Sequence, residues 1–126
     1  MKILVVDDEK DIQALFEQRF RKEIRSGEME FAFANSGEEA LTYLQDRGHE
    51  AVLILSDINM PGMSGLELLR RIKEKFAEPP PMVLMITAYG DNDNHRTAMR
   101  LGANDFLTKP IDFTALKEQL KGYLHD

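Results

Sequence analysis

The sequence of 126 residues contains no cysteine. Disulfide bonds, zinc sites built on cysteine and thiol catalysis are therefore excluded. Basic residues are outnumbered by acidic ones, 16 against 22, which gives a net charge of −6 at neutral pH. Because phosphate backbones and anionic lipid surfaces repel a protein of this charge, we expect neither nucleic acid nor a membrane as a direct partner.

Long apolar runs and glycine-rich loops are also missing. The longest apolar runs, residues 51–55 and 82–86, have five residues each, whereas a membrane-spanning helix needs about 20. The apolar run at residues 3–6 is too short for the core of a signal peptide. Neither G-x-x-x-x-G-K-[ST] nor G-x-G-x-x-G occurs, which disfavours nucleotide binding. These absences favour a soluble, cytoplasmic protein.

Short apolar runs alternate along the chain with segments of helical periodicity. Runs rich in Val, Ile, Leu and Phe predict strands covered on both faces, at residues 3–6, 31–34, 51–55, 82–86 and, more weakly, 105–108. Between them, apolar residues recur at intervals of three and four, which predicts five helices, the first over residues 11–24. This strict alternation predicts a single α/β domain with a mostly parallel sheet.

The starts of three predicted helices carry capping residues. Ser36 with Glu39, and Ser64 with Glu67, have the spacing of a capping box. Asp112 precedes the last helix and is a candidate N-cap.

Polar side chains follow the ends of the predicted strands. They are Asp7 and Asp8 after the first, Asp57 after the third, Thr87 after the fourth, and Thr108 and Lys109 after the fifth. In an open parallel sheet the carboxyl ends of the strands line the ligand crevice. Three carboxylates, a hydroxyl and an ammonium group would therefore converge on one edge.

This combination of groups favours a divalent cation and a phosphoryl group. A single aspartate after a strand is more often a turn or capping residue. Three carboxylates at one edge would repel one another unless they share a cation, and all-oxygen ligands without His or Cys suit Mg²⁺. One carboxylate could act as a nucleophile and form an aspartyl phosphate, while Lys109 neutralises phosphoryl oxygens.

Four segments stand out together by their composition and spacing: VVDDE at residues 5–9, DINMPGMSG at 57–65, ITA at 86–88 and LTKP at 107–110. Together they resemble the receiver domain of two-component response regulators. The resemblance implies a flavodoxin-like α/β fold, with a doubly wound five-stranded parallel sheet in the order 2-1-3-4-5 and five helices. It also implies one receiver domain over residues 1–126, which we expect to be the N-terminal part of a longer regulator.

The resemblance implies a role for each acidic residue of the site. Asp57 would be the phosphoacceptor that attacks a phosphohistidine on a sensor histidine kinase or phosphotransfer protein, or a small acyl or amido phosphate. Mg²⁺, with Mn²⁺ as an alternative, would be bound directly by Asp8 and Asp57, by Asp7 through water, and by the backbone carbonyl of Asn59. Lys109 would contact the phosphoryl oxygens.

The same resemblance implies a switch. Thr87 would move to bond a phosphoryl oxygen, and Phe106, which stands where the family often has tyrosine, would swing inward. Asn59 and Tyr89 would control the lifetime of the phosphoryl group, and the Lys109–Pro110 peptide would be cis.

The implied function is that of a two-component signalling switch, although the domain would catalyse its own phosphorylation and dephosphorylation. The predicted fourth helix, the strand at 105–108 and the last helix would form the surface that contacts an output domain or a downstream protein. A phosphorylation-dependent homodimer is a further partner that the resemblance allows.

Two other functions stay open at this point. A phosphatase of the haloacid dehalogenase type would also use a strand-end Asp, a Thr, a Lys and Mg²⁺. Its nucleophile would lie in an Asp-x-Asp motif after the first strand, but the corresponding residues here are Asp7-Asp8-Glu9, with Glu at the third position. A receiver-like module that never meets phosphate is the second alternative. The three histidines, His49, His95 and His125, are not at metal-ligand spacing, and we expect them to be exposed.

Overall fold

The computed structural model describes residues 2–47, 53–76, 81–88 and 90–124. Its centre is one parallel sheet of five strands in the order β2-β1-β3-β4-β5, as predicted. The strands are β1 (Lys2–Val6), β2 (Glu30–Ala34), β3 (Leu53–Asp57), β4 (Met82–Thr87) and β5 (Asp105–Thr108). Each pair of neighbouring strands is parallel and in continuous register, so the ends of all five strands meet at one edge.

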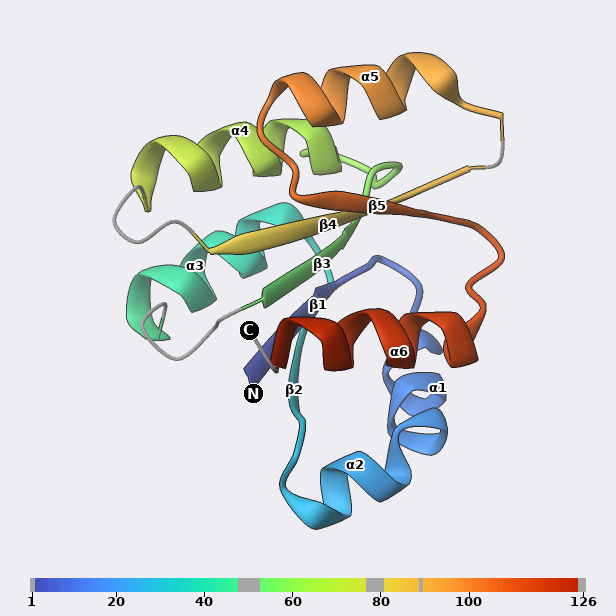
Figure 1. The fold of residues 1–126 in the computed structure, drawn as a ribbon. Helices are drawn as coiled ribbons and strands as arrows, with labels where there is room; N and C mark the ends of the chain where they lie inside the picture. Colours follow the sequence, from blue (N-terminus) through green and yellow to red (C-terminus); the bar gives the residue numbers. More distant parts are fainter. Residues whose placement is uncertain (1, 48–52, 77–80, 89, 125–126) are drawn as a thin grey trace.

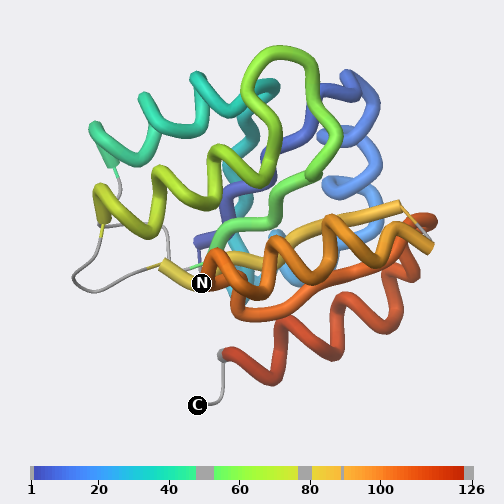
Figure 2. The backbone as a smooth tube through the Cα atoms, turned by 90° about the horizontal axis from the view of Figure 1, so that it is seen from above, coloured from blue at the N-terminus to red at the C-terminus, as the bar shows by residue number. Residues whose placement is uncertain are grey.

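Helices cover both faces of this sheet (Figure 1). They are α1 (Ile12–Arg19), α2 (Arg21–Ser26), α3 (Gly37–Arg47), α4 (Gly65–Lys75), α5 (Asn92–Arg100) and α6 (Phe113–Leu124). On one face α3, α4 and α5 follow one another side by side, while α1, α2 and α6 lie on the other (Figures 1 and 2). No helix in the described ranges is long and apolar enough to cross a bilayer.

The alternation of side chains along each strand divides the core into two layers. In β1, Leu4 and Val6 pack with α3, α4 and α5, whereas Ile3 and Val5 pack with α1 and α6. Because every one of these four side chains is buried, the strand reads as a continuous apolar run rather than as an alternating one.

Five of the phenylalanines form one aromatic cluster beneath α1 and α6. They are Phe16, Phe20, Phe31, Phe33 and Phe113, with ring centroids 5.0 to 6.3 Å apart. Edge-to-face and offset packing at such distances stabilises aromatic pairs beyond their buried area. The cluster anchors α1 and α6 to β2 on this side of the sheet.

The predicted first helix, residues 11–24, is wrong as a single helix, and the described residues form six helices rather than five. Phe20 has φ −108° and ψ 23°, outside the helical region, and its ring is wholly buried in the aromatic cluster. The chain resumes as α2 with a rotated face, so that Glu23 is buried and Ile24 is exposed. Burial of Phe20 therefore overrides the helical spacing that placed Ile24 inside.

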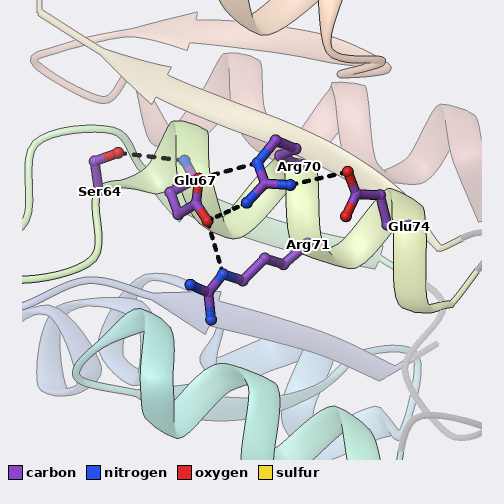
Figure 3. Close-up of polar contacts among 5 residues, drawn as sticks. All are labelled: Ser64, Glu67, Arg70, Arg71 and Glu74. Carbon is purple, nitrogen blue, oxygen red and sulfur yellow. Dashed lines mark hydrogen bonds and ion pairs between the residues drawn. The ribbon is translucent and has the colours of Figure 1, made fainter.

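The three predicted capping residues are confirmed. The Oγ atoms of Ser36 and Ser64 accept hydrogen bonds from the N–H groups of Glu39 and Glu67, and Asp112 Oδ1 accepts from the first turn of α6. The Glu67 side chain accepts hydrogen bonds from Arg70 and Arg71 on the exposed surface of α4 (Figure 3). These bonds lower the pKa of Glu67 to about 2, but pairs so exposed add little to stability.

Candidate functional site

Two aspartates end neighbouring central strands. Asp7 follows β1, and its N–H donates to the Ala34 carbonyl oxygen over 3.1 Å, which continues the ladder to β2. Asp57 is the last residue of β3. The side chains of Asp7 and Asp57 are held by backbone donors two residues further on, because Asp7 Oδ1 accepts from Glu9 N–H and Asp57 Oδ1 from Asn59 N–H. Both aspartates are 2% exposed, and both point their carboxylates at the same edge.

The lysine that follows β5 reaches across to this edge. Lys109 Nζ lies 2.9 Å from Asp57 Oδ2, and the Lys109 N–H donates to the Thr87 carbonyl oxygen over 2.8 Å. The Lys109–Pro110 peptide is cis, as predicted. The backbone bond to β4 and the turn after Lys109 thus direct its ammonium group at the carboxylate of a strand two places away in the sheet.

Three carboxylates converge beside this ion pair. Oxygen atoms of Asp7, Asp8 and Asp57 all lie within 4.8 Å of one another, with Asp8 exposed and the other two buried. Burial is the main cause that raises the pKa of Asp7, and the nearby charge of Asp57 adds to it. Desolvation alone would lower the pKa of Lys109, but the hydrogen bond and charge of Asp57 outweigh it and raise that pKa. Lys109 is therefore a cation at neutral pH.

The donor set of this edge fits a hard divalent cation. Its side-chain ligands are carboxylate oxygens only, and one face is open to water through Asp8. Mg²⁺ favours such oxygen ligands and retains several waters when one or two carboxylates bind it. A cation there would also relieve the repulsion among three carboxylates that one lysine cannot balance.

The other predicted site residues lie close to the edge, with different exposures. Thr87 is 3% exposed, and its hydroxyl donates to the Ala88 carbonyl oxygen over 2.9 Å. Asn59 is exposed. Phe106 lies on the edge strand β5, and since it pairs in register with Met85 it shares a sheet face with Thr87. Tyr89 lies outside the described residues.

The expectation for His95 is wrong. Its imidazole is half-buried, and its ring centroid lies 3.5 Å from that of Phe106. A single histidine on a helix gives no sequence signal for such a contact, because the contact depends on how α5 packs against β5. His49 and His125 lie outside the described residues.

An apolar groove of about 570 Å³ opens beside the acidic edge. The residues that line it come from the end of β1, from α1 and from the turn after β5: Asp7, Glu9, Ile12, Leu15, Arg19, Lys109, Pro110, Ile111 and Phe113. The sequence places Ile12 and Leu15 on the apolar stripe of the first helix, where they read as core residues. Both side chains are half-buried and line the groove, and Ile12 also packs against the core beneath α1.

A glycine brings the backbone of α4 against the phosphoacceptor candidate. The N–H of Gly65 donates to the Ile58 carbonyl oxygen over 2.8 Å. A Cβ atom on Gly65 would lie 2.0 Å from the carbonyl oxygen of Asp57. Only glycine permits this approach, so Gly65 sets the position of Asp57 relative to α4.

The sheet order, the helices on both faces and the acidic crevice define a doubly wound α/β protein of the flavodoxin-like class. The family model of the response regulator receiver domain matches residues 3–121. The chain therefore belongs to the response regulator receiver domain family.

Relatives of two lengths support this assignment. Sporulation initiation phosphotransferase F of Bacillus subtilis is 36% identical over 123 residues, which cover 98% of this chain and 93% of that protein. Response regulator protein PilR of Pseudomonas aeruginosa is 39% identical over 120 residues, but the chain spans only 24% of its length. A receiver domain structure from Clostridium thermocellum superposes with a TM-score of 0.83 at 30% identity, covering 96% of this chain and 91% of that one.

Proposed function

We propose that this domain is the phosphoacceptor of a two-component pathway, with Asp57 as the residue that receives the phosphoryl group. The observation that carries the proposal is the approach of Lys109 Nζ to within 2.9 Å of Asp57 Oδ2, beside the carboxylates of Asp7 and Asp8. Family membership supports this signalling role.

The proposed reaction transfers a phosphoryl group to a carboxylate. An oxygen of Asp57 forms a bond to phosphorus, and the bond from phosphorus to a histidine nitrogen, or to the acyl oxygen of a small donor, breaks. The leaving imidazole or carboxylate keeps the electron pair of that bond. Lys109, whose pKa is raised, keeps its positive charge and contacts the phosphoryl oxygens as charge develops on them.

Asp8 and Asp57 would bind Mg²⁺ directly, Asp7 through water, and the Asn59 carbonyl oxygen would complete the protein ligands, with Mn²⁺ as a substitute. When bound, the ion neutralises negative charge on the transferring group. The convergence of carboxylate oxygens of Asp7, Asp8 and Asp57 within 4.8 Å supports this role, because Mg²⁺ favours ligands of this kind.

The conformational part of the proposal concerns Thr87 and Phe106, which lie on the face of the sheet that α5 covers. Thr87 would exchange its bond to Ala88 for one to a phosphoryl oxygen, and Phe106 would respond. The surface of α5, β5 and α6 would then contact an output domain, a downstream protein or a second copy. Asn59 and Tyr89 would tune the lifetime of the phosphoryl group. On this proposal the domain is a cytoplasmic switch rather than an enzyme with a separate substrate.

The apolar groove supports a protein donor. It adjoins both Asp7 and Lys109 and offers Ile12, Leu15 and Phe113 to a partner. A sensor histidine kinase or phosphotransfer protein that docks there would bring its phosphohistidine to the acidic edge. A small phosphodonor needs no such surface.

The test is intact mass after incubation with Mg²⁺ and acetyl phosphate. One phosphoryl increment is expected in the wild type, with none in Asp57→Asn or in EDTA. Asp8→Asn should label far more slowly, whereas Asp11→Asn, which removes an exposed charge at the start of α1, should label normally. No increment with several donors would favour a phosphate-independent module, and steady release of phosphate from unrelated esters would favour a phosphatase.

A further inference from the structure

The contact between His95 and Phe106 lies outside the large aromatic cluster and on the opposite face of the sheet. The two ring centroids are 3.5 Å apart with an angle of 39° between the planes. Both side chains are half-buried, so the imidazole covers part of the phenyl ring at the surface between α5 and β5. Phe106 cannot leave this position without breaking the contact or moving His95 with it.

A chain of hydrogen bonds links His95 to Thr87. The Thr87 hydroxyl donates to the Ala88 carbonyl oxygen over 2.9 Å, and the same oxygen accepts the Asp91 N–H over 3.2 Å. The Asp91 carbonyl oxygen in turn accepts the His95 N–H over 3.2 Å. One carbonyl oxygen therefore serves both Thr87 and the start of the helix that carries His95.

The backbone of β5 is fixed at the other end of this chain. Asp105 Oδ1 accepts the Phe106 N–H over 2.8 Å, and Asp105 Oδ2 accepts from Gln119 of α6 over 2.7 Å. These bonds tie the backbone at Phe106 to α6. We therefore expect a rearrangement of the neighbouring residues to rotate the phenyl ring of Phe106 rather than to move its backbone. A change at Thr87 can thus reach the ring through the hydrogen bonds to α5 and through the packing around the ring, where His95 is its aromatic contact.

We propose that His95 is a positioning residue of the switch: its ring holds Phe106 against α5 and passes a change in the hydrogen bonding of Thr87 to the surface of α5 and β5. The proposal rests on the proposed function, because it requires Thr87 to leave the Ala88 carbonyl oxygen when Asp57 carries a phosphoryl group. Phe106 has no hydroxyl group with which to fix its position, and the tilted contact with the imidazole takes the place of such a bond.

The experiment follows the Phe106 ring by carbon-13 and proton NMR in the full chain. Phe106→Leu identifies the ring signals among those of the other phenylalanines. Beryllium fluoride with Mg²⁺, an unreactive mimic of a bound phosphoryl group, is the ligand. We expect a nuclear Overhauser contact between the two rings before the mimic is added, and a shift of the Phe106 signals when it binds.

Removing the imidazole should uncouple the ring from the site. In His95→Ala and His95→Gln, we expect the Phe106 shift caused by the mimic to fall at least about threefold, while acetyl phosphate still labels Asp57. His95→Phe, which keeps an aromatic ring at this position, should restore most of the shift. Arg96→Ala, which removes an exposed ion pair with Asp93 on the same helix, should behave as the wild type.

Two results would overturn the proposal. An undiminished Phe106 shift in both His95→Ala and His95→Gln, with normal labelling, would show that the ring responds without the imidazole, and only this role of His95 would fail. Absence of labelling in the wild type would remove the proposed function and the switch together. Amide spectra of each variant establish that it is folded, and a change in stability alone would not abolish the ring response.

Discussion

Substitution of Gly65 by alanine tests how closely α4 must approach the phosphoacceptor candidate. The added Cβ atom would lie 2.0 Å from the Asp57 carbonyl oxygen and 2.7 Å from Ile58 Cα. Ordinary contacts between such atoms are about 3.5 Å or longer, so the backbone of α4 or of β3 must shift by about 1.5 Å to relieve the closer contact. Neither atom belongs to a flexible side chain that could turn away.

We expect Gly65→Ala to lower the free energy of unfolding by about 3 kcal/mol, the upper end of the usual cost of overpacking, because both clashing atoms are backbone. Because Gly65 is the first residue of α4, the stabilisation that alanine gives over glycine in the middle of a helix does not offset this loss. Since the shift falls on Asp57 itself, labelling by acetyl phosphate should slow by about 10- to 100-fold.

Gly122→Ala is the matched control. Gly122 is inside α6, and a Cβ atom there meets nothing within 4 Å. This variant should gain roughly 0.5 to 1 kcal/mol and label normally. Urea unfolding followed by circular dichroism measures both variants. If Gly65→Ala proved as stable as Gly122→Ala, the argument from close approach would be wrong.

Three further predictions follow from buried polar groups. Burial raises the pKa of Asp7 in the folded protein. The contribution of its carboxyl group to the free energy of unfolding is therefore fully present below the ordinary pKa of 3.8 and is lost as pH rises through the folded pKa. Without Mg²⁺, Asp7→Asn should therefore be ~1 kcal/mol more stable than wild type at pH 7, with the difference vanishing near pH 4 in urea titrations. Asn104→Ala, which leaves the Val83 N–H without its 2.8 Å acceptor, should cost about 1 to 3 kcal/mol in the same assay, whereas Asn104→Asp should not. Lys117→Met together with Lys121→Met, which removes the cations 3.5 and 3.8 Å from the two oxygens of the buried Glu23 carboxylate, should cost roughly 2 kcal/mol or more, and adding Glu23→Gln should recover much of it; an additive triple variant would contradict this.

The sheet could be predicted from the sequence because its evidence is local. Each strand is a short apolar run, and a parallel sheet buries both faces of such runs. The candidate site could be predicted for a related reason. Asp7, Asp57 and Lys109 each follow a strand, and parallel strands place their ends at one edge whatever lies between them in sequence.

The break after α1 and the contact of His95 could not be predicted in this way. Both depend on how one element packs against another that is distant in sequence. Phe20 interrupts its helix to fill an aromatic cluster with β2 and α6, and the rotation that follows buries Glu23 in place of Ile24. Helical periodicity describes one helix at a time and contains no information on such a choice.

Stability and the proposed chemistry are opposed at the acidic edge of the sheet. The fold holds three carboxylates within 4.8 Å, raises the pKa of one of them by burial, and supplies one ammonium group, that of Lys109, at the edge. A core built for stability alone would exclude such a cluster, since charge buried without a partner is costly. The close approach of Gly65 and the hydrogen bonds of Asp7, Asp57 and Lys109 nevertheless fix these groups in place, so that they are already oriented before a cation or phosphoryl group arrives. A site whose charged groups are preorganised needs less rearrangement during the reaction than a site that must assemble around its ligand.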